Sequence, residues 1–322
     1  MGNEMRVGVL APLSRPGWVE AGRQLVAGAE LAARERSVEL VVRDTAADPA
    51  RAVAAVDELV GLGVDALVGE YHSVVARAVA ERAAALGEPY LCSSAVLDEL
   101  VTEPTDWVAR IAPVQSRGWR IFAEYLLSVG HERVAVAAQT SVYWAAGVGV
   151  LRKYLDVVEL TSVEPAVVCD ELAACGATAL VLLVGTPEPG VPIVEAVRRD
   201  ARLAEVLIGA PAGQPEFAEW AGLFGIPFLR YLPDELTPLG AQVKAQLGGE
   251  PSFVAFEGYD AIAVLAEVLR IHGAKWQKVA VQGTRGEITF SRVPGIGVWQ
   301  WAWSPIQVVE RTPAGFHTLH QA

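Results

Sequence analysis

Two loops that follow predicted strands carry hydroxyl groups beside glycine or other small residues. The first is Gly69-Glu70-Tyr71-His72-Ser73, which comes directly after a predicted strand at 66–68. Tyr71 supplies a ring with a hydroxyl, and Ser73 stands where the next helix begins. A serine at that place either caps the helix or shares the first helical N–H groups with a bound carboxylate or amide oxygen. Both uses are compatible, so this loop is a candidate binding site.

The second polar loop is Ser93-Ser94-Ala95-Val96, after a predicted strand at 90–92. Its small side chains leave backbone N–H groups open to an anion or a carbonyl oxygen, although simple solvation is the alternative. Trp18 follows Gly17 in the loop after the first strand, and its ring forms either one wall of a pocket or a packed surface tryptophan. In an open α/β sheet, ligands bind beyond the carboxyl ends of the strands, where all three loops would lie.

The sequence lacks the motifs that mark nucleotide, zinc and hydrolase sites. It has no G-x-x-x-x-G-K-[ST], no H-E-x-x-H and no G-x-S-x-G. Gly147-Val148-Gly149 lacks the third glycine of a dinucleotide-binding loop. Of the five histidines, only His317 and His320, near the end of the sequence, are close together. We therefore expect a protein that is not an enzyme, with no catalytic residues, no metal and no cofactor.

The charge balance excludes several partners. The 322 residues include 26 Lys plus Arg and 38 Asp plus Glu, a formal net charge of −12. This charge would repel phosphate backbones and anionic lipid, so we expect no nucleic-acid partner. The three cysteines, Cys92, Cys169 and Cys175, form no C-x-x-C and are expected to be small buried hydrophobic residues.

The first residues resemble neither a secretory leader nor a membrane span. Residues 1–6 lack a basic start followed by a long apolar stretch, and the apolar run at 7–13 is short and contains Pro12. We expect no direct membrane insertion. The expected location is cytoplasmic as the sequence stands, and periplasmic or at the cell surface if a leader has been removed.

Strand-like and helix-like segments alternate along the chain, which is typical of parallel sheets wrapped by helices. The predicted strands are 6–10, 38–43, 66–68, 90–92, 133–138, 179–184 and 206–209. The predicted helices are 19–36, 49–62, 75–86, 116–129, 144–154, 191–200 and 251–272. Near the end, Trp299, Trp301 and Trp303 alternate as on one face of a strand, which favours packing against the second lobe over a ligand cage. The predicted fold class is α/β, with two doubly wound parallel-sheet lobes.

Several segments, in this order and spacing, resemble the leucine/isoleucine/valine-binding proteins. They are Val7-Gly8-Val9-Leu10-Ala11-Pro12-Leu13, Gly28-Ala29-Glu30-Leu31-Ala32, Val64-Asp65-Ala66-Leu67-Val68-Gly69, Gly258-Tyr259-Asp260-Ala261 and Gly286-Glu287-Ile288-Thr289-Phe290. The resemblance implies the type I periplasmic-binding-protein fold, with three crossings near residues 114, 232 and 297. Lobe 1 would hold 1–113 plus 233–296 and lobe 2 would hold 114–232 plus 297–322, with a ligand cleft between them.

The resemblance also implies site residues. By position, Ser73 and the loop Ser94-Ala95-Val96 are similar to the residues that hold an α-carboxylate through hydroxyl and backbone N–H groups. Tyr143 corresponds to the second-lobe tyrosine that closes over the ligand, and Thr186 falls on a loop where another ring often sits. The acidic residue that pairs with an ammonium group falls near Pro211, where the sequence has no carboxylate. The expected ligand is therefore an amino acid, or an amide or carboxylate analogue.

Four functions remain open. The first is the substrate-binding component of an ABC transporter, with the transporter's membrane subunits as partners. The second is a cytoplasmic sensor that regulates a partner protein, because Gly69-x-Tyr71-x-Ser73 with Arg77 resembles the amide-sensor branch of the family. The third is an enzyme on the same two-lobed fold, and the fourth is a regulatory domain that has lost its ligand.

Overall fold

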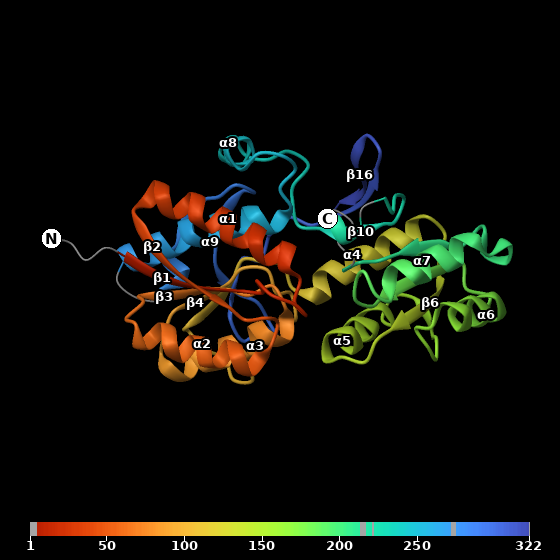
Figure 1. Cartoon of the computed structure of the whole chain (residues 1–322), viewed down its shortest axis with the longest axis horizontal. Coiled ribbons are helices and arrows are strands. Elements are labelled where there is room, and N and C mark those ends of the chain that lie inside the picture. The colour runs from red at the N-terminus through yellow and green to blue at the C-terminus, as the bar shows by residue number, and fades with distance from the viewer. Residues whose placement is uncertain (1–4, 213–216, 221, 272–274, 322) are drawn as a thin grey trace. The chain divides into compact units, whose positions relative to one another are not determined.

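The chain divides into two compact units, each built from discontinuous segments. The structure is a computed structural model, and it describes residues 5–212, 217–220, 222–271 and 275–321 (Figure 1). Unit 1 comprises Met1–Val114 and Tyr231–Pro305, and unit 2 comprises Gln115–Arg230 and Ile306–Ala322. The chain therefore passes between the units three times.

Unit 1 is built on a seven-stranded sheet in the order β13-β14-β5-β4-β3-β1-β2. All neighbouring strands are parallel except β13 and β14. The strands are β1 (Met5–Ala11), β2 (Val38–Asp44), β3 (Ala66–Gly69), β4 (Tyr90–Cys92), β5 (Val108–Arg110), β13 (Ser291–Arg292) and β14 (Trp299–Gln300). β3, β4 and β5 are buried along their whole length, as expected for parallel strands covered on both faces.

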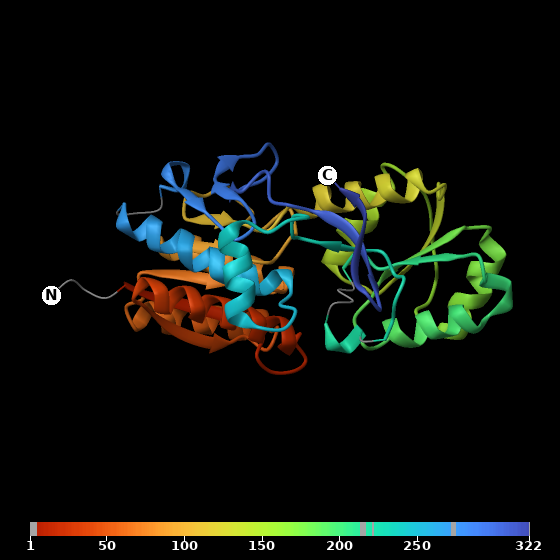
Figure 2. The same ribbon diagram turned by 90° about the horizontal axis from the view of Figure 1, so that it is seen from above.

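Helices cover both faces of this sheet (Figure 1). They are α1 (Val19–Arg36), α2 (Pro49–Gly61), α3 (Ser73–Leu86) and α9 (Phe253–Arg270), while α8 (Pro238–Leu247) contacts α1. α1 and α9 lie side by side (Figure 2) because glycines remove side chains where they touch. A Cβ at Gly28 would lie 1.8 Å from the carbonyl oxygen of Ala255, and one at Gly258 would lie 2.1 Å from that of Leu25.

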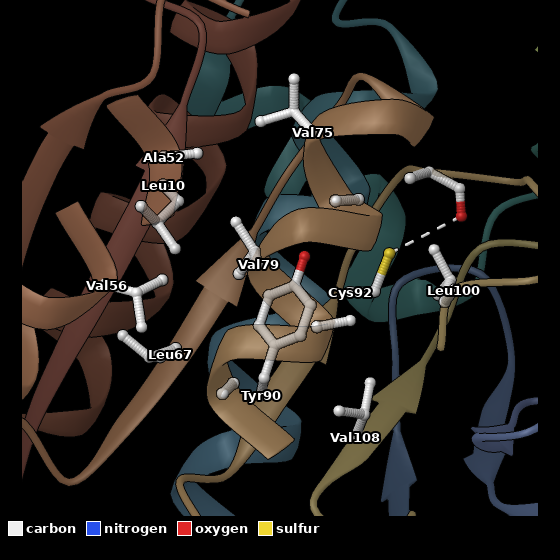
Figure 3. Packing of buried hydrophobic residues seen from close by; sticks show 14 of the residues in the cluster. Leu10, Ala52, Val56, Leu67, Val75, Val79, Tyr90, Cys92, Leu100 and Val108 are labelled. Atoms are coloured by element: carbon white, nitrogen blue, oxygen red, sulfur yellow. Dashed lines mark hydrogen bonds between the residues drawn. The ribbon is translucent and has the colours of Figure 1, made fainter. Parts of the chain in front are cut away.

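The opposite face of the sheet packs on α2 and α3 through an apolar core (Figure 3). Leu10, Val56 and Val79 are among its fully buried members. Tyr90 satisfies its buried hydroxyl by donating to the carbonyl of Gly69 at 2.6 Å. A short antiparallel pair, β11 (Ala280–Gln282) and β12 (Glu287–Thr289), and a 3₁₀ turn at Trp276–Lys278 complete the unit.

Unit 2 repeats the same plan with fewer strands. β7 (Asp156–Glu159), β6 (Arg133–Ala138), β8 (Ala179–Leu183) and β9 (Leu207–Gly209) form a parallel sheet in that order. Its helices are α4 (Gln115–Ser128), α5 (Val142–Leu151), α6 (Pro165–Cys175) and α7 (Gly190–Arg199), with 3₁₀ turns at Ala201–Leu203 and Ala218–Trp220. An antiparallel sheet of β10 (Phe228–Arg230), β15 (Gln307–Thr312) and β16 (Gly315–Gln321) adds to it.

The doubly wound α/β prediction is confirmed in both units. In unit 1 the chain runs from β1 outward to β2 and then returns past β1 to β3, and in unit 2 it runs from β6 to β7 and then to β8. The order of strands therefore reverses at β1/β3 and at β6/β8. Such a switch point is where open parallel sheets bind ligands.

Two expectations about the last part of the chain are wrong. The third crossing lies at 305–306 rather than near 297, because β14 pairs with β5 inside the sheet of unit 1. The tryptophans do not share one strand face: β14 ends at Gln300, Trp301 is 3% exposed and Trp303 is 82% exposed. All three belong to unit 1. Of the cysteines, Cys92 and Cys169 are buried as expected, whereas Cys175 is half-buried.

Candidate functional site

The carboxyl edge of the unit 1 sheet brings together residues from separate loops. The rings of Trp18, from the loop after β1, and Tyr71, from the loop after β3, stack with centroids 5.5 Å apart and planes 26° apart. Both side chains are half-buried. These loops flank the β1/β3 switch point, so two residues singled out from the sequence form one aromatic surface there.

Ser73 joins the two polar loops instead of capping α3. His72 occupies the N-cap position and makes no side-chain capping bond. The Ser73 hydroxyl accepts hydrogen bonds from the backbone N–H groups of Val96 and Leu97, each at 3.3 Å. The N–H of Val96, expected to be open to a ligand, is therefore engaged by Ser73. Ser94, Ala95 and Val96 are buried.

Glu70 is a site residue that the sequence reasoning missed. It is fully buried, and its Oε1 accepts from the N–H groups of Tyr71 at 2.7 Å and His72 at 2.9 Å. Its Oε2 accepts from the Thr45 hydroxyl at 2.5 Å. A carboxylate just before a helix was the available signal, because the start of a helix favours negative charge. Glu70 therefore occupies the first N–H groups at the start of α3.

A buried network of charges lies behind the Ser94 loop. Arg285 donates through Nε to Asp260 at 3.0 Å and through Nη1 to Glu257 at 3.2 Å, and all three side chains are fully buried. Burial raises the pKa of Glu257 to about 7, an effect opposed by the Arg285 charge and by the Ser94 hydroxyl. Burial also raises the pKa of Asp260. Asp260 lies in one of the segments that resemble the family, but its partner Arg285, 25 residues away, was not foreseen from the sequence.

Arg110 also holds the loop that contains Ser94, through a backbone carbonyl. It is fully buried at the end of β5, where Nη1 donates to the carbonyl of Leu97 at 2.5 Å and Nε donates to Gln300 at 2.7 Å. Gln300 is its register partner on β14. The loop after β4 is thus held by Ser73 at its N–H groups and by Arg110 at a carbonyl, which fixes its conformation on two sides.

The carboxyl edge of unit 2 is dominated by rings. Ser141 caps α5 by accepting from the N–H of Trp144 at 3.0 Å, and this places Tyr143 in the first turn. The Tyr143 ring lies 6.0 Å from Trp119, edge to face, and 4.6 Å from Trp144. Burial raises the pKa of the Tyr143 hydroxyl. Trp119 sits against Gly147, where a Cβ would lie 1.9 Å from the indole ring.

Thr186 lies on another loop at this edge, after β8. It is 8% exposed, and its hydroxyl has no hydrogen-bond partner within the part of the chain that the structure describes. No hydrogen bond or ring contact between described residues joins it to Tyr143. Pro211 follows β9, near the position where the resemblance would place an acidic partner for an ammonium group. Residues 213–216 of the same loop lie outside the described residues.

Three further features of the described residues concern metal ligands, membrane-spanning helices and surface hollows. No group of three His, Cys, Asp or Glu side chains among them could hold a metal ion. Within the described ranges, no helix is both long and apolar enough to span a membrane. A hollow of about 390 Å³ lies at the other end of the unit 1 sheet, where α1 leads into β2, and is lined by Glu30, Ala33, Arg34, Ser37, Val38 and Leu40.

Comparison with known proteins identifies the family. A family model described as periplasmic binding protein matches residues 4–295. No curated protein matches. Among solved structures, a leucine-binding protein LivK from Thermotoga maritima is 18% identical, with a TM-score of 0.81 over 98% of this chain and 97% of that one.

Two further structures share the fold. A solute-binding protein of an ABC transporter from R. palustris, in complex with 4-hydroxybenzoate, is 17% identical, with a TM-score of 0.81 over 99% and 96% of the two chains. LivJ from Streptococcus pneumoniae, in complex with isoleucine, is 18% identical, with a TM-score of 0.78 over 95% of each chain. The extent of the family match, together with the two doubly wound units, shows that the chain belongs to the periplasmic binding protein family, type I.

Proposed function

We propose that this chain is a solute-binding receptor for a small ligand that has one carboxylate and an apolar body. The observation that carries the proposal is the carboxyl edge of unit 1, where the Trp18–Tyr71 stack lies beside the loops joined by Ser73. Leucine, isoleucine and 4-hydroxybenzoate, named for the similar structures, share these two features and differ in the rest. Branched-chain amino acids and aromatic acids are therefore both within the proposed class.

Each group has a proposed task. The hydroxyl groups of Ser73 and Ser94 and the N–H of Ala95 bind the carboxylate, and the rings of Trp18 and Tyr71 contact the apolar body. Hydrogen bonds to a charged group are worth about 1.5–3 kcal/mol each, so the serines dominate the affinity. For unit 2, we propose Tyr143 and the buried hydroxyl of Thr186 as candidate ligand contacts.

We assign the receptor to delivery of its ligand to the membrane subunits of an ABC transporter. The alternative, an amide sensor that regulates a partner protein, was based on Gly69-x-Tyr71-x-Ser73 followed by Arg77. Arg77 forms an ion pair with Glu99 at 2.9 Å, in which the Arg77 side chain is half-buried and the Glu99 side chain is exposed. Arg77 thus has a protein partner, which supports the transporter assignment over the sensor.

A thermal-shift screen tests the proposed ligand class. The panel contains leucine, isoleucine, 4-hydroxybenzoate, benzoate, acetamide and urea. A ligand at 100 times its Kd adds about 2.7 kcal/mol to the free energy of unfolding, which gives a clear rise in Tm. We expect a rise with at least one carboxylate and none with urea or acetamide.

A double variant then tests the residues. Ser73→Ala with Ser94→Ala should weaken carboxylate binding by more than about tenfold, because two hydrogen bonds to a charged group are lost. Ser291→Ala, at an exposed serine of the same unit, is the matched control and should bind like the wild type. A Tm rise with amides alone would support the sensor instead, and no rise with any compound would contradict the receptor.

A further inference from the structure

Arg110 is a fully buried arginine whose hydrogen-bond partners carry no charge. Its Nε donates to the side-chain oxygen of Gln300 at 2.7 Å, and its Nη1 donates to the carbonyl of Leu97 at 2.5 Å. Its Nη2 is buried and has no hydrogen-bond partner among the described residues. Asp98, which is half-buried, acts on Arg110 only from beyond ion-pair distance. Because a buried charge without a counter-charge is strongly unfavourable, an anion near Arg110 would be stabilised.

Arg285, the buried arginine of the charge network described above, has the counter-charge that Arg110 lacks. Its guanidinium forms ion pairs with two buried carboxylates. Beside Arg110 the corresponding acceptor is the Gln300 amide, which donates through Nε2 to the carbonyls of Ala112 at 2.7 Å and Trp301 at 3.1 Å. These two bonds fix the amide with its oxygen toward Arg110. The charge of Arg110 is therefore met by a neutral group that is held in place.

The loop that contains Ser94 lies next to this guanidinium. Cys92, the last residue of β4, is the register partner of Arg110 on β5, so the loop leaves the sheet beside Arg110. The Cys92 thiol donates to the carbonyl of Ala95 at 3.6 Å, and Arg110 donates to that of Leu97. Two carbonyl groups of the loop are thus bound by the end of the sheet.

Two N–H groups of the same loop have no partner among the described residues. The N–H groups of Ser93, Val96 and Leu97 donate to other described residues. Those of Ser94 and Ala95 do not, although these residues are only 4% and 0% exposed. Buried N–H groups are nearly always paired, so these two are suited to a ligand oxygen. A buried cation and two open donors therefore belong to one short segment.

We propose that Arg110 makes the site selective for an ionised carboxylate, as the counter-charge of the ligand behind the Ser94 loop. A carboxylate that accepts from the N–H groups of Ser94 and Ala95 brings its negative charge to the loop that Arg110 holds. A neutral amide of the same shape can accept the same hydrogen bonds without that gain. Arg110 does not touch the ligand, so it is a positioning residue. This inference rests on the proposed function and adds to it the residue that separates acids from amides.

The test compares each acid with its own amide. Calorimetric titrations at pH 6.5 use 4-hydroxybenzoate against 4-hydroxybenzamide, and leucine against leucinamide. The wild type should bind at least one acid more tightly than its amide by about tenfold or more, because coupling between close charges begins at about that value. The ratio of the two affinities is the readout, since a residue that only shapes the loop changes both affinities alike.

Three variants separate charge from shape. Arg110→Met removes the charge, so affinity for the acid should fall by about tenfold or more and affinity for the amide by less than about threefold. Arg110→Lys keeps the charge and should keep the ratio close to that of the wild type. Arg43→Met is the matched control: Arg43 lies in the same register row at the end of the sheet, but Glu58 pairs with it at 2.6 Å. Its affinities should equal those of the wild type.

Equal binding of acid and amide by the wild type, or an Arg110→Met variant that weakens both alike, overturns the inference. If the amide binds too weakly to measure, the acid alone decides: a loss with methionine but not with lysine supports the inference, and an equal loss overturns it. If Arg110→Met does not fold, Gln300→Glu replaces it by supplying a counter-charge inside the protein, and an unchanged ratio or acid affinity then overturns the inference.

Failure of this inference is distinct from failure of the proposed function. An acid that binds tightly with a ratio independent of Arg110 removes the counter-charge and leaves the receptor standing. No binding by any of the four compounds overturns both proposals.

Discussion

The two parallel sheets share one strand order over four strands, β2-β1-β3-β4 in unit 1 and β7-β6-β8-β9 in unit 2. The loops at their carboxyl edges are held in place in different ways. In unit 1, buried charges and hydroxyls fix the loops: Glu70 binds the turn before α3, Arg110 holds the loop after β4, and Arg285 ties α9 to the β11–β12 turn. In unit 2, the rings of Trp119 and Tyr143 fill the corresponding place. One topology therefore supports an edge fixed by buried charges beside the Trp18–Tyr71 stack, and an edge fixed by packed rings.

This difference assigns different tasks to the two edges. Hydrogen bonds to charged groups depend on direction and protonation, so the edge of unit 1 is suited to recognise a carboxylate. Packed rings depend on shape and volume, so the edge of unit 2 is suited to limit the size of what it contacts. Substitutions that remove charge should therefore damage unit 1 most, and substitutions that add volume should damage unit 2 most.

The largest expected effect is the loss of Arg285. Arg285→Leu leaves Glu257 and Asp260 buried without their common partner, and breaking a buried pair in this way costs about 3–5 kcal/mol. We expect a large drop in the midpoint of urea unfolding at pH 8. The drop should be smaller at pH 5, because Glu257, whose pKa is raised, is then neutral in the folded protein.

Arg270→Leu is the matched control, because Arg270 forms an exposed ion pair with Glu267. Exposed pairs are worth at most about 1 kcal/mol, so this variant should unfold near the wild-type midpoint. Equal losses in the two variants would contradict the view that buried charge holds unit 1 together.

A smaller effect is expected from added volume in unit 2. Gly147→Ala drives a methyl group into the Trp119 ring, and overpacking of this kind costs about 1–3 kcal/mol. The Tyr143 ring moves with Trp119, so near-ultraviolet circular dichroism should change as well. Gly149→Ala lies on the same helix with nothing within 4 Å, and it should raise stability by up to about 1 kcal/mol. If the free energy of unfolding changes in the same direction in both variants, the Trp119 ring does not restrict the side-chain volume that α5 can carry at Gly147.

Elements with unbroken apolar patterns could be predicted from the sequence, and elements interrupted by charged residues could not. The helix at 19–36 and the strands at 90–92 and 133–138 have the predicted bounds, because their apolar patterns are unbroken. β5, β7 and α6 were missed because charged residues interrupt their apolar patterns. β14 was placed in the wrong unit because its partner, β5, lies 190 residues earlier in the chain.

The loops of the candidate site could be predicted from the sequence, but the contacts between residues of different loops could not. Trp18 and Tyr71 were chosen from separate loops, but nothing in the sequence shows that their rings stack. Ser73 was expected to cap a helix or bind a ligand, and its bonds to the next loop depend on the distance between β3 and β4. Glu257 and Arg285 were missed because a pair 28 residues apart has no local signature.

The most direct test of the central claim compares one double variant in each unit by calorimetric titration with the tightest ligand of the panel. Ser73→Ala with Ser94→Ala removes two hydroxyls from unit 1, and Tyr143→Phe with Thr186→Val removes two from unit 2 with little change in shape. We predict a loss of more than about tenfold in affinity for the first pair and of less than about threefold for the second, because the carboxylate is bound by unit 1. An equal or larger loss for the second pair would contradict the assignment of the carboxyl edge of unit 1 as the main binding surface.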